Sequence, residues 1–127
     1  MTDQSSLSEI QEVIQSYLDG IHFGRVEDLK RAMHPDCRMI SLSKGTYANT
    51  DMATYFEAVA NRQSPNAVGE PREDRILEIS VPDDCISTVQ LECLVLGKAC
   101  RDRLTLIRAN NSWSIISKVF SFKLRIA

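Results

Sequence analysis

Apolar residues recur every three or four positions near the start of the chain, the spacing of one face of an α-helix. The stripe consists of Leu7, Ile10, Val13, Ile14, Tyr17, Leu18 and Ile21. Ser6 and Glu9 have the spacing of a capping box, in which two side chains satisfy free backbone amides of the first turn. We therefore expect a helix that runs to about Asp19, with Gly20 as its stop.

Two shorter helices and one strand are expected next. The second helix spans residues 26–33 and ends at His34-Pro35, because a residue before proline avoids helical backbone angles. A short strand over residues 38–42 follows, and a Lys44-Gly45 turn ends it. The third helix spans residues 52–60.

Beyond residue 75 the helical spacing gives way to the alternation of strands. Strands are expected over residues 77–81 and 85–96, with Pro82-Asp83-Asp84 as the turn between them. Residues 62–74 contain two prolines and a glycine among polar side chains. This long loop is a candidate lid or pocket rim.

Residues 101–122 carry two β-branched, apolar runs on either side of Asn110-Asn111. Asn tolerates the positive φ of a tight turn, so these segments are predicted to form a hairpin with Asn110-Asn111 as its loop. Regular pairing from that loop predicts two faces. The interior face carries Asp102, Leu104, Leu106, Trp113, Ile115 and Val119, and the opposite face carries Arg103, Thr105, Ile107, Ile116, Lys118 and Phe120.

Both faces of this hairpin contain large apolar residues, whereas a sheet with one solvated face should alternate cleanly. The chain's own helices are expected to cover one face. A second copy of the chain is expected to cover the other, in a homodimer centred on Ile107, Ile116 and Phe120.

The order of elements defines the fold class. Three helices and an early strand precede about four antiparallel strands, which is typical of an α+β fold with the helices on one side of a curved, mainly antiparallel sheet. The length of 127 residues and the absence of repeats or linkers predict a single domain over residues 1–127.

Composition narrows the classes of function. A formal net charge of −2 gives no electrostatic argument for nucleic acid or an anionic membrane as partner. No apolar run approaches the roughly 20 residues of a spanning helix, and residues 1–6 lack the features of a signal peptide, so we expect a cytoplasmic location. Nothing in the sequence indicates a metal or cofactor. The four cysteines have no CxxC spacing and are expected to be free, mostly buried thiols, namely Cys37, Cys85, Cys93 and Cys100.

Asp102 has the parity of the interior residues in the predicted hairpin. An inward carboxylate is costly unless it is hydrogen-bonded, paired or neutral. Two interpretations stay open: a structural acid paired with a nearby arginine, or an acid in a pocket, where desolvated carboxyls are common.

The whole pattern resembles the nuclear transport factor 2-like (SnoaL-like) superfamily, and within it the lumazine-binding-like branch. The resemblance rests on residues 13–20 (VIQSYLDG), 29–36 (LKRAMHPD), 102–106 (DRLTL) and 113–120 (WSIISKVF), in that order and spacing. It implies a cone-shaped half-barrel with a pocket between helices and sheet, and commonly a sheet-to-sheet homodimer.

The resemblance also implies roles for single residues. Asp102 matches the oxyanion-stabilising acid of the ketosteroid isomerases, and Tyr17 matches their catalytic tyrosine on the first helix. Their carboxylate base on an early strand has no counterpart at residues 39–42. Dehydratase-like members use a histidine, for which His34 is the candidate.

Two functions follow as hypotheses. The first is a small-molecule-binding protein with a mostly apolar pocket, in which Asp102 as acid and His34 as base could transfer a proton on a small carbonyl compound. Its expected lining is Tyr17, His34, Tyr47, Phe56, Asp102 and Trp113. The alternative is a non-catalytic interaction domain that acts as a homodimer. An open cavity that exposes Asp102 would favour the first, and a filled interior the second.

Overall fold

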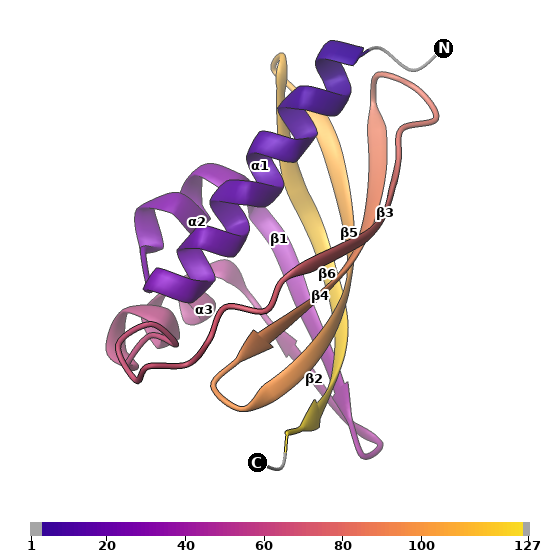
Figure 1. Cartoon of the computed structure of the whole chain (residues 1–127). Coiled ribbons are helices and arrows are strands. Elements are labelled where there is room, and N and C mark those ends of the chain that lie inside the picture. Colours follow the sequence, from indigo (N-terminus) through magenta and orange to yellow (C-terminus); the bar gives the residue numbers. More distant parts are fainter. Residues whose placement is uncertain (1–3, 126–127) are drawn as a thin grey trace.

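The computed structural model describes residues 4–125, and within them three helices lie together on one face of a sheet (Figure 1). The helices are α1 (Gln4–Phe23), α2 (Val26–Ala32) and α3 (Met52–Asn61). The predicted helices are confirmed, and the Asp51 side chain caps α3 by accepting a hydrogen bond from the Thr54 amide.

Both ends of α1 differ from the prediction. The helix begins at Gln4, so Ser6 lies inside it, buried, rather than at a capping box. It also continues through Gly20 and ends before Gly24, whose φ of +68° suits glycine. Gly20 is instead a packing residue, because a Cβ there would lie 2.7 Å from Cγ of Leu29 on α2.

The sheet has six strands in the order β2-β1-β6-β5-β4-β3 and is not closed. All neighbours are antiparallel except β1 and β6, which run parallel. The strands are β1 (Met33–Ser43), β2 (Thr46–Thr50), β3 (Arg75–Ser80), β4 (Ile86–Val95), β5 (Lys98–Ala109) and β6 (Ser112–Leu124). The α+β prediction is confirmed. Strand β2 was not predicted, since its residues Thr46–Thr50 contain one large apolar side chain and do not alternate.

Two-residue turns connect three of the four antiparallel hairpins, and residues 81–85 connect β3 with β4. Both central residues have positive φ in Lys44-Gly45, Leu96-Gly97 and Asn110-Asn111. This backbone geometry matches the right-handed twist of the flanking strands. The predicted turn at Asn110-Asn111 is therefore confirmed, as is the pairing of Arg108 with Trp113 and of Leu106 with Ile115.

A β-bulge then changes the register of β6. Thr105 pairs with Ser117 instead of Ile116, so Leu104 lies opposite Lys118 and Asp102 opposite Phe120. One extra residue exchanges the two faces of a strand. The predicted placement of the residues after the bulge was therefore wrong: Lys118 and Phe120 are on the helix side, and Val119 is 38% exposed on the other.

Side chains from all three helices and the inner sheet face form the core between the helices and the sheet. Its largest fully buried members include Tyr17, Ile10, Ile14, Leu29, Leu91, Leu104, Leu106 and Ile115. No helix within residues 4–125 is long and apolar enough to cross a membrane.

Candidate functional site

Two buried side chains that were predicted to act together are in direct contact. The Tyr17 hydroxyl, from α1, donates a hydrogen bond of 2.5 Å to Oδ2 of Asp102 on β5. Both side chains are fully buried. Burial and the neighbouring carboxylate raise the pKa of Tyr17 well above its ordinary value, so the phenol keeps its proton. The other oxygen, Oδ1 of Asp102, is buried without a hydrogen-bond partner in the described chain.

Lys118 lies beside this pair because of the bulge in β6. Only 6% of its surface is exposed, and its ammonium nitrogen lies over three aromatic rings. The distances to the ring centroids are 5.1 Å for Tyr17, 5.5 Å for Tyr55 and 4.6 Å for Phe120. Such cation–π contacts are stronger when the cation is partly removed from water.

The electrostatic surroundings keep Lys118 charged. Burial disfavours the ammonium, but nearby Tyr55 and Asp102 and the two thiols Cys93 and Cys100 outweigh it and raise the pKa of Lys118. Within residues 4–125 the ammonium forms no ion pair within 4.0 Å and no hydrogen bond. Its donors are therefore available to a bound molecule.

Lys118 faces a small cavity between the helices and the sheet. The cavity has a volume of about 130 Å³. Its lining comes from α1, α3, β1, β6 and the β4–β5 hairpin, and consists of Ile21, Met39, Tyr55, Arg62, Val95, Leu96, Lys98, Cys100, Lys118 and Phe120. The lining combines apolar side chains with three cations and contains no acidic residue.

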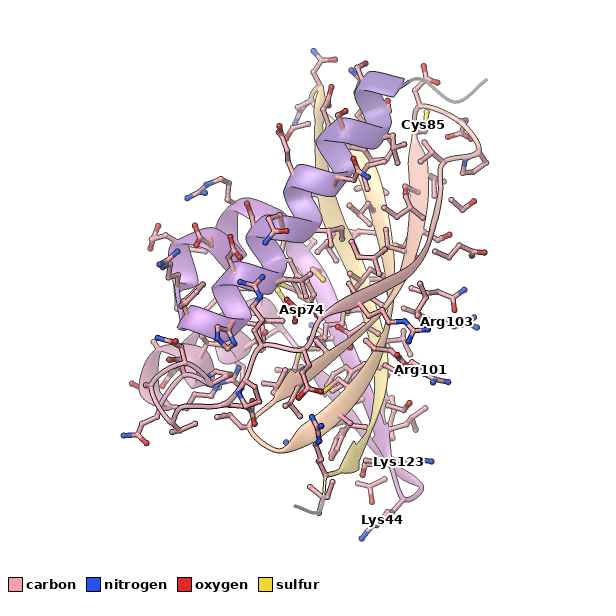
Figure 2. The ribbon with its side chains drawn as sticks, in the orientation of Figure 1. Lys44, Asp74, Cys85, Arg101, Arg103 and Lys123 are labelled. Carbon is pink, nitrogen blue, oxygen red and sulfur yellow. The ribbon has the colours of Figure 1, made fainter. Side chains whose placement is uncertain are left out.

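The long loop that borders this cavity is tied to the rest of the molecule. Arg72 forms ion pairs of 2.8 Å with Asp19 of α1 and 2.6 Å with Asp74, which Figure 2 labels. Glu70 accepts hydrogen bonds of 2.7 Å from the backbone amides of both Leu96 and Gly97, at the tip of the β4–β5 hairpin. The loop therefore holds the hairpin that forms one wall of the cavity.

Comparison with known families agrees with this architecture. A family model described as "Putative lumazine-binding" matches residues 5–121, almost the whole chain. The chain belongs to this family. The predicted resemblance to the lumazine-binding-like branch is thereby confirmed. A comparison with curated proteins found no match.

Solved structures place this lumazine-binding-like chain in the nuclear transport factor 2-like fold. A protein of unknown function from Silicibacter pomeroyi is 18% identical, with a TM-score of 0.84, and the match covers 97% of this chain and 100% of that one. One from Shewanella baltica is 15% identical, with a TM-score of 0.83 and coverage of 97% and 98%. One from Methylobacillus flagellatus is 18% identical, with a TM-score of 0.80 and coverage of 96% and 95%. These three share the fold and are all described as of unknown function.

The other predicted site residues of this lumazine-binding-like chain lie elsewhere. His34, on β1, accepts a hydrogen bond of 3.0 Å at Nδ1 from the Asp36 amide and does not line the cavity. Tyr47, on β2, is 61% exposed. Phe56 packs on the core beside Tyr55, with 6.0 Å between ring centroids. Trp113 is buried and borders a separate surface hollow between α1 and the β5–β6 turn.

None of the ten described residues that line the cavity was predicted as a site residue, and two of them, Lys118 and Tyr55, carry polar groups that the proposal below uses. Lys118 was assigned to the outer face because regular alternation was assumed beyond Ile116. The pair Ile115-Ile116, two consecutive β-branched residues, was the available signal of a bulge. Tyr55 was recognised as part of the buried edge of α3, but nothing in the sequence distinguished a buried tyrosine that lines a cavity.

The cysteines are free thiols, as predicted, but one of them is not buried. Cys37, Cys93 and Cys100 are buried, whereas Cys85 is exposed beside the turn before β4. Burial raises the pKa of Cys37 to about 11. Within residues 4–125, no group of three histidine, cysteine or acidic side chains could hold a metal ion.

A larger hollow of about 480 Å³ lies beside the end of β4 that extends past Glu92, where β3 no longer pairs with it. Its charged rim is largely self-paired, as in the 2.7 Å ion pair of Arg125 with Glu73. Among the described residues it lacks an ammonium group without an ion pair or hydrogen bond, which Lys118 supplies in the smaller cavity, so we assign the candidate site to the latter.

Proposed function

We propose that this protein binds a small molecule in the cavity between the helices and the sheet. The observation that carries the proposal is the Lys118 side chain, which is 6% exposed and lines this cavity without a hydrogen bond or ion pair to another residue within 4–125. Convergent polar groups in a mostly apolar pocket are typical of ligand sites. The family's description as lumazine-binding is consistent with a binding role.

We propose further that Lys118 and Tyr55 are the groups that touch the ligand, and that Asp102 and Tyr17 are positioning residues. Asp102 is fully buried behind Lys118 and does not line the cavity. Tyr55 and then Asp102 raise the pKa of Lys118 against the effect of burial, and Tyr17 fixes the Asp102 carboxylate through the 2.5 Å hydrogen bond. His34 is outside this proposal because it does not border the cavity.

Such a pair of donors could also assist proton transfer on a small carbonyl compound. An ammonium and a phenol that donate to a carbonyl oxygen stabilise the negative charge of an enolate, while a solvent water or hydroxide takes the α-proton, because the described lining of the cavity has no carboxylate or histidine. Exchange of α-protons of simple ketones for deuterium, followed by proton NMR, tests this part of the proposal. Exchange that is faster with wild type than with Lys118→Met supports it, and equal rates with both contradict it.

A binding screen with a blocked variant tests the main proposal. Met39 lines the cavity from β1, and Met39→Trp should fill much of the space. We expect members of a small-fragment library to bind wild type in ligand-observed NMR and to lose binding in Met39→Trp. The matched control is Val119→Trp, on the opposite face of the sheet. Ligands that bind both variants as well as wild type, or a library without any binder, would contradict the proposal.

The alternative role as a homodimer has support from the sheet face that points away from the helices. Figure 2 shows Arg101, Arg103 and Lys123 on this face. Exposed apolar side chains accompany them, with Leu42 46%, Tyr47 61% and Val119 38% exposed. We propose that a second copy packs here. Sedimentation velocity at micromolar concentration tests this, since a dimer supports it and a monomer overturns it.

A further inference from the structure

We propose that the ligand of this cavity is a small organic monoanion, a carboxylate whose apolar body is no larger than a benzene ring. Lys118 and Tyr55 would bind the carboxylate, and the apolar walls would enclose the body. This inference rests on the binding function proposed above and names its ligand class.

The first argument is the set of free donors. Lys118 and Tyr55 both line the cavity, and neither side chain forms a hydrogen bond to another residue within 4–125. The Lys118 ammonium lies 5.5 Å from the centroid of the Tyr55 ring. Both residues line the same small cavity, and an ammonium or phenol donor forms a stronger hydrogen bond to a charged acceptor than to a neutral one.

The second argument is the charge of the lining. Arg62, Lys98 and Lys118 contribute three cations to a cavity without an acidic residue, although the whole chain carries a formal charge of −2. Asp102 faces Lys118 from behind. The side chains of Arg62 and Lys98 have no carboxylate partner within 4.0 Å in the described part of the chain, and Lys98 rests 4.7 Å from the centroid of the Phe122 ring. The positive potential at the entrance favours anions and repels cations.

The third argument is size. A protein cavity of about 150 Å³ holds benzene, whereas pockets for drug-sized ligands measure about 300–1,000 Å³. The cavity here measures about 130 Å³. It therefore accommodates a single ring or a short chain, with Ile21, Met39, Val95 and Phe120 as apolar contacts.

Three probes of nearly equal shape separate charge from size. Benzoate, benzamide and benzamidine are an anion, a neutral amide and a cation on the same ring. We expect isothermal titration calorimetry at low salt to show benzoate binding at least about tenfold more tightly than benzamide, and no binding of benzamidine. Equal affinities for benzoate and benzamide, or a preference for benzamidine, would overturn the inference.

Variants then assign the preference to named residues. Lys118→Met should abolish the preference for benzoate over benzamide, and Tyr55→Phe should weaken benzoate binding by about three- to tenfold. Lys98→Met and Arg62→Met, at the rim, should each weaken benzoate binding more than benzamide binding. These two variants keep the test valid if Lys118→Met fails to fold. Lys123→Met, on the opposite sheet face, should bind as wild type does. A preference for benzoate that survives all four cavity variants would contradict the proposal.

The pattern of results separates this inference from the function on which it rests. Benzamide that binds wild type as well as benzoate does, and is excluded by Met39→Trp, would leave the binding function standing and refute the anion. Absence of binding for all three probes would refute the ligand class, whereas the fragment screen alone decides the binding function.

Discussion

Lys118 and Asp102 depend on each other, because both side chains are buried and Asp102, after Tyr55, contributes to the raised pKa of Lys118. Asp102 is fully buried, and its Oδ1 has no hydrogen-bond partner among residues 4–125. Lys118 is enclosed by three aromatic rings. Removal of one charge leaves the other buried and uncompensated, which is the costly situation for any ion pair in a protein interior.

A double-mutant cycle should reveal this dependence. We expect Lys118→Met and Asp102→Asn each to lower the free energy of unfolding at pH 7 by about 3 kcal/mol. The variant with both changes should lose less than the sum, because no charge remains unpaired. Urea unfolding measures all four proteins. Strictly additive losses would show that the two charges do not interact.

Tyr17 predicts a decline of stability at alkaline pH. Burial and the Asp102 carboxylate raise its pKa well above the ordinary value of about 10. The folded chain thus holds the phenolic proton more tightly than the unfolded chain does. The resulting stabilisation is complete below about pH 10 and is lost as pH rises through the folded value.

Absorbance at 295 nm follows this ionisation. The difference between the absorbance titrations of wild type and Tyr17→Phe gives the ionisation of Tyr17. In wild type this ionisation should appear above pH 10 and coincide with unfolding. Reversible ionisation of that tyrosine near pH 10 in the folded protein would contradict the prediction.

At the scale of elements, the contact of α1 with α2 depends on one glycine. A Cβ at Gly20 would meet Cγ of Leu29 at 2.7 Å and Cδ2 at 2.8 Å. Gly20→Ala should therefore destabilise the protein by about 2 kcal/mol through overpacking, although alanine is the better helix former. Thermal and urea unfolding measure the change. Ser8→Ala, at an exposed position of α1, should stay within about 0.5 kcal/mol of wild type. A stabilised Gly20→Ala would show that Leu29 moves aside freely.

The wall of the cavity depends on the loop that holds the β4–β5 hairpin. Glu70 accepts both amide hydrogen bonds at its tip, each of 2.7 Å. Glu70→Ala should make the amides of Leu96 and Gly97 exchange with deuterium at least about tenfold faster. NMR resolves these two amides individually. Glu57→Ala, at an exposed position of α3, is the control, and unchanged exchange in Glu70→Ala would mean that the loop does not hold the hairpin.

Periodicity in the sequence predicted those helices and strands in which apolar residues recur at a regular spacing. The stripe from Leu7 to Ile21 and the runs around Asn110-Asn111 identified α1 and the final hairpin. Periodicity could not locate the bulge, because a bulge is a single departure from alternation. Nor could it identify β2, because β2 is an edge strand of the sheet and its side chains are mostly exposed.

Regular spacing also decided which residues of the candidate site could be placed from the sequence. Asp102 and Tyr17 precede the bulge or lie on a regular helix, so their inward orientation followed from spacing, and they do contact each other. Lys118 and Phe120 follow the bulge, so spacing assigned them to the wrong face. His34 was expected near the pocket because it follows the second helix. A histidine beside a proline carries no information on which way its side chain points, so its actual position could not be predicted.

At the scale of the whole molecule, the outer face of the sheet predicts how the protein associates. Val119 is exposed on this face, where it lies opposite Arg103 of β5 and Ile40 of β1, and the predicted interface residues Ile107 and Ile116 are half-buried in the single chain. We expect Val119→Asp to weaken a dimer by at least about tenfold, since a specific interface buries about 1,600 Å² in total and tolerates an unpaired charge poorly at its centre. Sedimentation over a concentration series measures the change. Lys44→Asp, at the tip of the β1–β2 hairpin, is a charged control, and equal effects of the two changes would argue against this interface.

The position of β6 has a consequence for synthesis on the ribosome. β6 is the last strand in the chain order, yet it lies in the interior of the sheet between β1 and β5. At about 5–20 residues per second, translation takes several seconds to proceed from the end of β1 to β6. During that time one edge of β1 exposes unpaired backbone groups, which is a recognised cause of aggregation. Nascent chains stalled before Ser112 should therefore aggregate or recruit chaperones, and slower growth at low temperature should raise the yield of folded protein.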